Sequence, residues 1–249
     1  MMIIAIALAA AAQQPKPEET EQWTPVPPIV TPGPVTSPAP PSDAVVLLGS
    51  GTDLKEWASM DGKAAAWTLN RDGSVTVKKG TGNIQTRRSF TNYQLHLEWR
   101  VPVGIKGEGQ GRGNSGLFLA STGAGDSGYE LQIVDSFNNK TYVNGQAASI
   151  YKQSPPLANA MRAPGQWQTY DVIWHAPVFN ADGSVKSQAR VTAFHNGVLV
   201  QDDYHVTGET AYIGKPQYEA HGPSPIKLQD HGDPSQPISF RNIWVRELP

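Results

Sequence analysis

A glutamate lies in the middle of a short segment whose other features are typical of a half-buried β-strand. In GYELQIVDS, residues 128–136, three apolar side chains alternate with Glu130 and Gln132. Side chains alternate between the two faces of a strand, so the apolar set would face a core and Glu130 would face away from it. Acids are depleted in strands and need water or a partner there. A carboxylate in such a place is suited to general acid–base chemistry.

A second acid falls on a comparable segment. YQLHLEWRV, residues 93–101, has the clearest alternation in the chain and places His96, Glu98 and Arg100 on one face. We expect this polar face to match that of Glu130, which would gather two carboxylates and a guanidinium. In the same way, residues 226–230 would turn Lys227 and Gln229 outward. The alternative is a solvated sheet face whose ion pairs each contribute under about 1 kcal/mol.

The elements that must position these residues are short strands. About a dozen β-rich runs follow one another from residue 43 to 248, and helical periodicity is nearly absent. Dipeptides that accept positive φ separate several runs: Asp72-Gly73, Asp182-Gly183 and Asn196-Gly197. We expect a tight hairpin at Asn196-Gly197. Strands without crossover helices predict an all-β fold, a two-sheet antiparallel jelly-roll sandwich.

The chain of 249 residues divides into three regions. An apolar run ends in Ala10-Ala11-Ala12 before the sequence turns polar, which predicts a signal peptide over residues 1–12. Residues 13–43 hold ten of the 21 prolines and few aliphatic side chains, so we expect an extended linker without a core. Residues 44–249 are long enough for one all-β domain. We therefore expect a secreted or periplasmic protein.

Composition excludes several classes of function. The net charge is −2 and no basic run occurs, so nothing indicates nucleic acid or an anionic membrane as a partner. Cysteine is absent, which excludes disulfides, a thiol nucleophile and a zinc–thiolate site. No apolar stretch after the signal is long enough for a membrane helix. The sequence leaves the oligomeric state open.

Nine segments, in order, cover nearly all of the domain from residue 45 on and carry a family resemblance. They are LLGSGTDLKEWAS (47–59), YQLHLEWRV (93–101), GNSGLFLA (113–120), YELQIVDS (129–136), GQAASIYKQSPP (145–156), APGQWQTYDVIW (163–174), HNGVLVQD (195–202), PIKLQDHG (225–232) and ISFRNIWVREL (238–248). The chain resembles the 3-keto-disaccharide hydrolase family, also named 3-keto-glucoside lyase/hydratase. It departs from the family pattern at Gln166-Trp167-Gln168, where EWN is usual, and at Lys227, where an aliphatic residue or glycine is common. The Lys227 departure could alter the pocket rim or the substrate preference.

The resemblance implies a concanavalin-like jelly roll that acts on oxidised sugars, specifically on 3-keto-glycosides. Such a reaction needs a base for the C2 proton, a stabiliser for the enolate oxygen and an acid for the departing aglycone. On this basis Glu130 is expected to be the base, with Glu98 as its competitor, and His231 the acid. The expected substrate-binding residues are Arg100, Asn114, Gln132, Asp135, Tyr151 and Gln229. Structural roles remain open for Arg100 as an ion-pair partner, for His231 and Asn114 in turns, and for Asp135 as a cap.

No cofactor and no metal site are expected. Loop acids could hold Ca²⁺, and Asp135 could join Glu130 and His231 around an ion, but no segment matches the calcium-loop pattern. Two other classes of function stay open. One is a non-catalytic carbohydrate-binding module, since jelly rolls serve both purposes. The other is an ordinary glycoside hydrolase, for which Glu98 and Glu130 would form the carboxylate pair.

Overall fold

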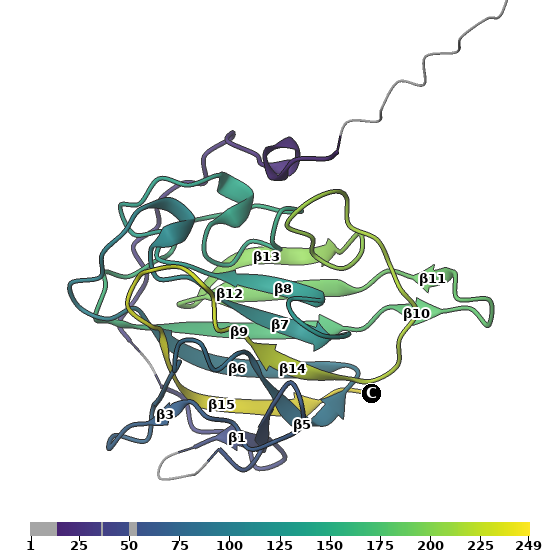
Figure 1. Cartoon of the computed structure of the whole chain (residues 1–249), viewed down its shortest axis with the longest axis horizontal. Coiled ribbons are helices and arrows are strands. Elements are labelled where there is room, and N and C mark those ends of the chain that lie inside the picture. The colour runs from purple at the N-terminus through teal and green to yellow at the C-terminus, as the bar shows by residue number, and fades with distance from the viewer. Residues whose placement is uncertain (1–13, 36, 50–53) are drawn as a thin grey trace, which may run out of the picture.

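Two antiparallel sheets, packed face to face, form the body of the protein (Figure 1). The computed structural model describes residues 14–35, 37–49 and 54–249. The larger sheet has the order β13 (Val198–His205), β12 (Arg190–His195), β9 (Trp167–His175), β6 (Tyr93–Arg100), β15 (Ser239–Glu247), β4 (Val75–Thr76) and β3 (Thr68–Leu69), and β1 (Val45–Leu48) also pairs with β15. The smaller sheet has the order β2 (Trp57–Ser59), β5 (Ile84–Phe90), β14 (Ser224–Leu228), β7 (Ser115–Ser121) and β8 (Gly128–Ile133).

The remaining elements are small. A two-stranded ribbon joins β10 (Val178–Phe179) to β11 (Val185–Ser187). Helical structure in the described residues is limited to the 3₁₀ turns η1 (Pro17–Thr20), η2 (Gly109–Gly111) and η3 (Val143–Gly145). The predicted hairpin joins β12 to β13, and Asn196 and Gly197 have φ of 53° and 79°. The predicted all-β jelly-roll sandwich is confirmed.

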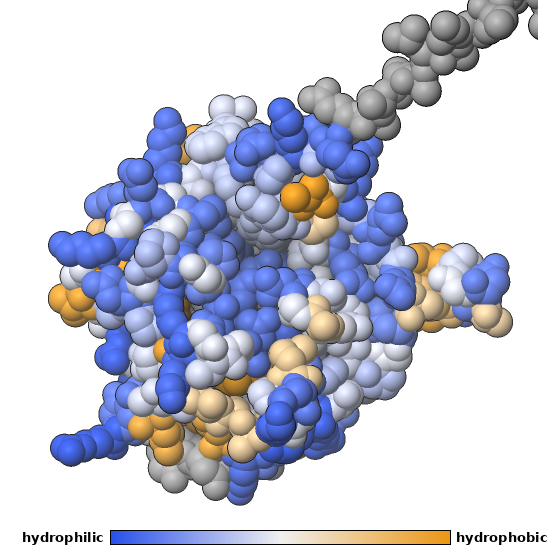
Figure 2. Space-filling view, viewed as in Figure 1, coloured by the Kyte–Doolittle hydropathy of each residue, from blue (hydrophilic) through white to orange (hydrophobic). Residues whose placement is uncertain are grey.

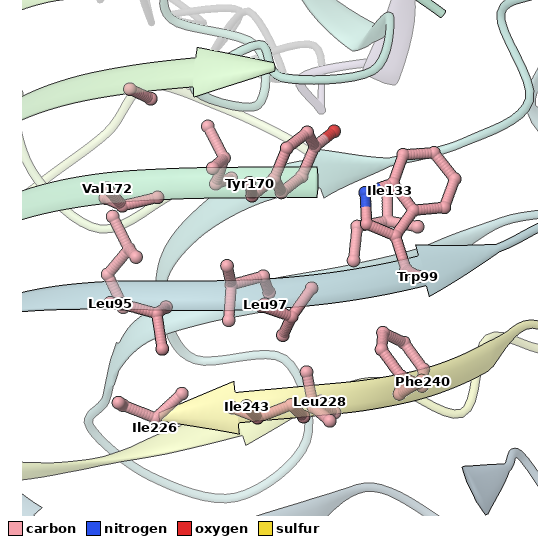
Figure 3. Close-up of a cluster of buried hydrophobic side chains, with 14 of the residues drawn as sticks. Leu95, Leu97, Trp99, Ile133, Tyr170, Val172, Ile226, Leu228, Phe240 and Ile243 are labelled. Carbon is pink, nitrogen blue, oxygen red and sulfur yellow. The ribbon is translucent and has the colours of Figure 1, made fainter. Parts of the chain in front are cut away.

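The core lies between the sheets and consists of the apolar faces that alternation predicts. Leu95, Leu97 and Trp99 of β6 are fully buried, and so are Leu131 and Ile133 of β8. Figure 3 shows the side chains of β6 and Ile133 of β8 together with buried residues of β9, β14 and β15. Removing such apolar surface from water is the main favourable contribution to folding. In a chain without cysteine, the fold depends on this packing and not on disulfides.

The two polar faces point in opposite directions, and this corrects one expectation. β6 belongs to the larger sheet and β8 to the smaller one, and each turns its apolar side toward the shared core. Glu98 and Arg100 therefore lie on the outer face of one sheet, whereas Glu130 lies on the outer face of the other. The structure does not bring the two glutamates together.

Residues 14–35 and 37–43, called the N-terminal arm from here on, lie along the surface of the domain (Figure 1). The arm is extended, as its composition predicts, but it is docked. Val30 N–H donates to the carbonyl of Asn159, and Asn159 N–H donates to that of Pro28. Arg162 donates to the carbonyls of Gly33 and Pro34. The expected signal peptide, residues 1–12, lies outside the described residues. Within them, no helix is both long and apolar enough to cross a membrane.

Candidate functional site

A pocket of about 260 Å³ opens on the outer face of the smaller sheet. Its lining is almost entirely polar or aromatic: Asn114, Asp126, Glu130, Gln132, Tyr151, Thr210, Tyr212, Gln229 and His231. Figure 2 shows this face of the molecule as largely hydrophilic and hollowed near its centre. The volume lies just under the range of about 300–1,000 Å³ usual for small-molecule sites. The pocket therefore suits a single small polar ring.

Glu130 lies at the base of the pocket, on β8, directly opposite Phe118 of β7. The residue is only 6% exposed, and no described residue donates a hydrogen bond to its carboxylate. Gly116 makes room for it, because a β-carbon at position 116 would lie 2.5 Å from Glu130 Oε1. Burial, followed by the negative charge of Asp126, raises the pKa of Glu130 to about 8. A buried carboxyl that titrates near neutrality is a recurrent feature of catalytic acids and bases.

Two charged neighbours act on Glu130 in opposite directions. Asp126 raises its pKa, whereas the ammonium of Lys227 lowers it. Lys227 is fully buried on β14, its ammonium lies 4.2 Å from the Phe118 ring centroid, and it donates to the carbonyls of Gly125 and Ser127. Lys227 thereby fixes the loop that brings Asp126 to the pocket. Lys227 is also one of the two places at which the sequence departs from the pattern of the family that it resembles.

His231 enters the pocket from the loop after β14 and is held by Asp233. Its Nδ1 lies 3.1 Å from Asp233 Oδ1, so Nε2 is left for a ligand. Burial raises the pKa of Asp233, but donors from His231, Ser235 and Lys79 outweigh burial and lower it to about 2. The backbone N–H of Asp233 also lies 3.2 Å from this Nδ1, so carboxylate and backbone together orient the imidazole.

Three amide side chains supply hydrogen-bonding groups to the pocket. Gln110 holds two of them, because its Oε1 accepts from Asn114 Nδ2 at 3.3 Å and from Gln132 Nε2 at 3.0 Å. The third, Gln229, has a buried Oε1 without a hydrogen-bond partner in the described protein. A buried acceptor without a partner costs free energy that a ligand hydroxyl would recover.

Tyr151 forms the aromatic side of the pocket. Its hydroxyl lies 2.7 Å from that of Tyr142. Burial raises its pKa far above the usual range, so the phenol stays protonated and remains able to donate. The backbone of Tyr151 is joined to β8, because its N–H donates to the carbonyl of Glu130.

Glu98 and Arg100, which the sequence placed with Glu130, do not contribute to this pocket. Burial raises the pKa of Glu98, but hydrogen bonds from His96, Ser37, Asn242 and Arg241 outweigh burial and lower it to about 2. Arg100 stacks over the Trp167 ring at 4.4 Å. This cation–π contact is a structural role, but it differs from the ion pair that the sequence left open for Arg100.

Asp135 is also separate from the pocket. Its Oδ2 accepts from Arg112 Nε at 2.7 Å, and its Oδ1 accepts from the backbone N–H of Phe137. Its contacts are those of the cap that the sequence offered as the alternative. Within the described ranges, no group of three or more His, Asp or Glu side chains is arranged to hold a metal ion.

Sequence reasoning missed several residues that the fold brings to the site. Asp126, Thr210 and Tyr212 line the pocket, and Gln110 and Asp233 hold its side chains in place. All five lie in loops or turns, where no hydrophobic period marks them. For Asp233, the HGD run after β14 could have indicated a histidine and carboxylate in contact.

Comparison with known proteins places this site in a family. Residues 43–246 match the model of the 3-keto-alpha-glucoside-1,2-lyase-like domain. A solved structure of a candidate glycosyl hydrolase from Parabacteroides distasonis is 52% identical, with a TM-score of 0.80, over 93% of this chain and 96% of that one. Residues 43–249 are 207 of the 249, which is less than the 93% of the chain that the match covers. The match therefore also includes part of the arm.

A second candidate glycosyl hydrolase from the same organism is 20% identical, with a TM-score of 0.57, over 80% of this chain and 91% of the other. At that identity the likeness shows the fold alone. The curated proteins include no match. Because the family model covers most of the chain, the protein belongs to the 3-keto-alpha-glucoside-1,2-lyase-like domain family.

Proposed function

We propose that this protein is a carbohydrate-active enzyme that cleaves 3-keto-glycosides by eliminating the aglycone and then adding water. Family membership and the 52%-identical candidate glycosyl hydrolase support action on a carbohydrate. The observation that carries the finer proposal is the buried, unpartnered carboxylate of Glu130 in a pocket of about 260 Å³. A carbon acid needs one well-placed base of raised pKa, and Glu130 has that character.

The reaction is a β-elimination followed by hydration. Glu130 takes the C2 proton, which the C3 carbonyl acidifies, and the electron pair moves to the C3 oxygen as an enolate. The enolate expels the aglycone from C1, and its departing oxygen takes a proton from His231. Water then adds its hydroxyl to C1 and its proton to C2 of the enone, so the net result is hydrolysis.

The other pocket residues bind and orient the sugar. Gln229 Oε1 lacks a donor and would accept from a ring hydroxyl. Tyr151 has a protonated phenol that can donate to the enolate oxygen, and Asn114 and Gln132 add amide groups. Because Gln110 and Tyr142 already hold these groups in place, little reorganisation is needed when charge develops.

The test is incubation with a panel of 3-keto-glycosides and their unoxidised parents, while the release of aglycone is followed. We expect release from the 3-keto compounds only, with an enone intermediate absorbing in the ultraviolet. Binding of the sugars without any turnover would instead support a carbohydrate-binding module and would contradict the proposal.

An ordinary glycoside hydrolase is the second candidate, and one observation favours it. Asp126 and Glu130 both line the pocket, and a carboxylate pair is what hydrolysis of an unoxidised glycoside requires. The pair differs from the one expected from sequence, because Asp126 takes the place of Glu98. Cleavage of unoxidised parents at rates equal to the 3-keto compounds would favour this candidate.

The pH dependence should report the ionisation of Glu130. Its pKa is about 8, and the base must be deprotonated, so kcat/KM should rise with pH through about 8. Asp126→Asn removes a negative charge that raises the Glu130 pKa, so kcat/KM should rise at lower pH. Lys227→Met removes a positive charge that lowers this pKa, so kcat/KM should rise at higher pH. Glu98→Gln is the matched control and should leave the midpoint in place. A profile that falls through this range would mean that protonated Glu130 is the active form.

We also propose that the protein is exported. The apolar run in residues 1–12 would be removed, and cleavage after Ala12 would leave the docked arm whole. N-terminal sequencing of the exported protein should then begin near Gln13, and an intact Met1 would contradict the proposal.

A further inference from the structure

The first part of the arm, residues 14–23, lies against the loop that leads to Tyr151. Val143 N–H donates to the carbonyl of Gln22 at 2.6 Å. The Asn144 side chain donates to the carbonyl of Thr20 and accepts from the N–H of Gln22, each at 2.9 Å. Three hydrogen bonds therefore fix the arm to the segment that contains η3. Figure 1 shows η1 of the arm beside the loops at this end of the domain.

Lys152 links the arm to the pocket lining. The residue is 5% exposed, and its ammonium donates to the carbonyl of Pro17 at 2.7 Å and to that of Tyr212 at 2.8 Å. One group thus joins η1 of the arm to a residue of the pocket wall. Lys152 also has a φ of 57°, a left-handed backbone conformation that residues other than glycine rarely adopt. Backbone strain of this kind persists only where surrounding contacts hold it.

The same ammonium faces a group of tyrosine rings. It lies 4.7 Å from the ring centroid of Tyr212, 5.5 Å from that of Tyr142 and 6.0 Å from that of Tyr151. Cation–π attraction at such distances contributes most where water is excluded. On the far side, Trp23 of the arm meets the Tyr142 ring edge-on at 6.2 Å. Tyr142 in turn holds the Tyr151 hydroxyl.

We propose that the first part of the arm is a structural component of the sugar pocket, and that Lys152 is the positioning residue through which it acts. The carbonyl of Pro17 holds the ammonium of Lys152, and the cation–π contacts of that ammonium hold Tyr151 and Tyr212 against the ligand site. This inference rests on the proposed function for the identity of the ligand as a sugar. It assigns no chemical step to Lys152, which touches the pocket residues and not the reacting atoms.

A role in stability alone makes a different prediction. If the arm were only an external brace, loosening it would lower the unfolding temperature and leave ligand binding unchanged. If it shapes the pocket, the loss should be in substrate binding, because the tyrosines would leave their bound positions while Glu130 and His231 stay in place. The division of the effect between KM and kcat therefore separates the two roles.

The experiment uses the full chain with the substitution Lys152→Met, which keeps the length of the side chain but removes the ammonium. We expect KM for a 3-keto-glucoside to rise about tenfold, with kcat changing less than about twofold. Trp23→Ala serves as a second variant that should fold, since Trp23 is 50% exposed, and we expect a KM rise of about threefold. Arg246→Met is the matched control, because it removes an ion pair to Asp43 at the other end of the arm.

Hydrogen exchange supplies a readout that does not need turnover. In Lys152→Met, amides of residues 140–153 and 208–213 should exchange faster, and in Arg246→Met they should not. If wild-type protein cleaves no 3-keto-glycoside, the proposed function fails, while the exchange data still test the link through Lys152. Unchanged exchange in both segments, or faster exchange with an unchanged KM, would overturn the inference.

Discussion

Glu130→Gln should lower kcat/KM on a 3-keto-glucoside by about 10³-fold, within the range of 10²–10⁴ that general-base catalysis contributes. The amide is nearly isosteric but cannot accept the C2 proton. Because Glu130 is buried without a hydrogen-bond partner in the described structure, the neutral amide should also fold at least as well as the wild type. Steady-state kinetics with thermal unfolding of the same samples would measure both effects.

One control variant makes the Glu130→Gln result specific. Gln132→Glu would not serve, because it alters the pocket itself, whereas Glu98→Gln changes the same residue type on the opposite outer face. We expect Glu98→Gln to retain kcat/KM within about threefold once stability is allowed for. Activity of Glu130→Gln close to that of wild type, with the fold intact, would exclude Glu130 as the base.

Glu98→Ala should lower stability more than Glu130→Gln does, and it should have little effect on kcat/KM. Glu98 is fully buried and holds Arg241 Nε at 2.6 Å, Asn242 Nδ2 at 2.9 Å and Ser37 Oγ at 2.5 Å. Removing one partner of a fully buried ion pair costs about 3–5 kcal/mol. The Arg241 side chain is 32% exposed and can be partly rehydrated, so the loss should lie at the lower end. We expect the free energy of unfolding to fall by about 3 kcal/mol in a denaturant titration.

The pH dependence of stability gives a second check on Glu98. Its folded pKa is about 2 and the ordinary value is 4.5, so its contribution is fully present above pH 4.5 and is lost as pH falls toward 2. The wild type should therefore lose stability over this range more steeply than Glu98→Ala. An equal loss of stability in the two proteins between pH 4.5 and pH 2 would contradict this role of Glu98.

The alternation of apolar and polar residues along the strands was enough to predict the core, because every second side chain of a strand lies on the same face of the sheet. It identified Leu95, Leu97 and Trp99 as core residues and Glu130 as outward-facing. Alternation could not state which of two sheets a strand joins. For that reason Glu98 and Glu130 were expected on a common face, although strand pairing places them on opposite sides of the sandwich.

The pocket was predictable where residues lie on strands or in segments of family resemblance, and not elsewhere. Glu130, Gln132 and Gln229 were reached through strand patterns, and His231 through the loop after β14. Asp126 and Tyr212 depend on how loops fold back over the sheet, which no local pattern encodes. The docking of the arm escaped prediction for a related reason. The arm contributes mainly backbone groups to its hydrogen bonds with the domain, and composition does not report them.

Gly116 has a consequence for engineering receptors from this enzyme. Its backbone lies outside the left-handed region, so alanine suits the strand conformation, yet the added carbon would lie 2.5 Å from Glu130 Oε1 and 3.0 Å from Phe118 Cε2. The carboxylate ends a flexible side chain and can turn aside without moving the backbone. One added methyl group would thus displace the carboxylate of the proposed base, while the amide and tyrosine side chains of the pocket could still bind a ligand. With the substrate proposed above, such a protein would be a reagent that binds 3-keto sugars and releases them unchanged.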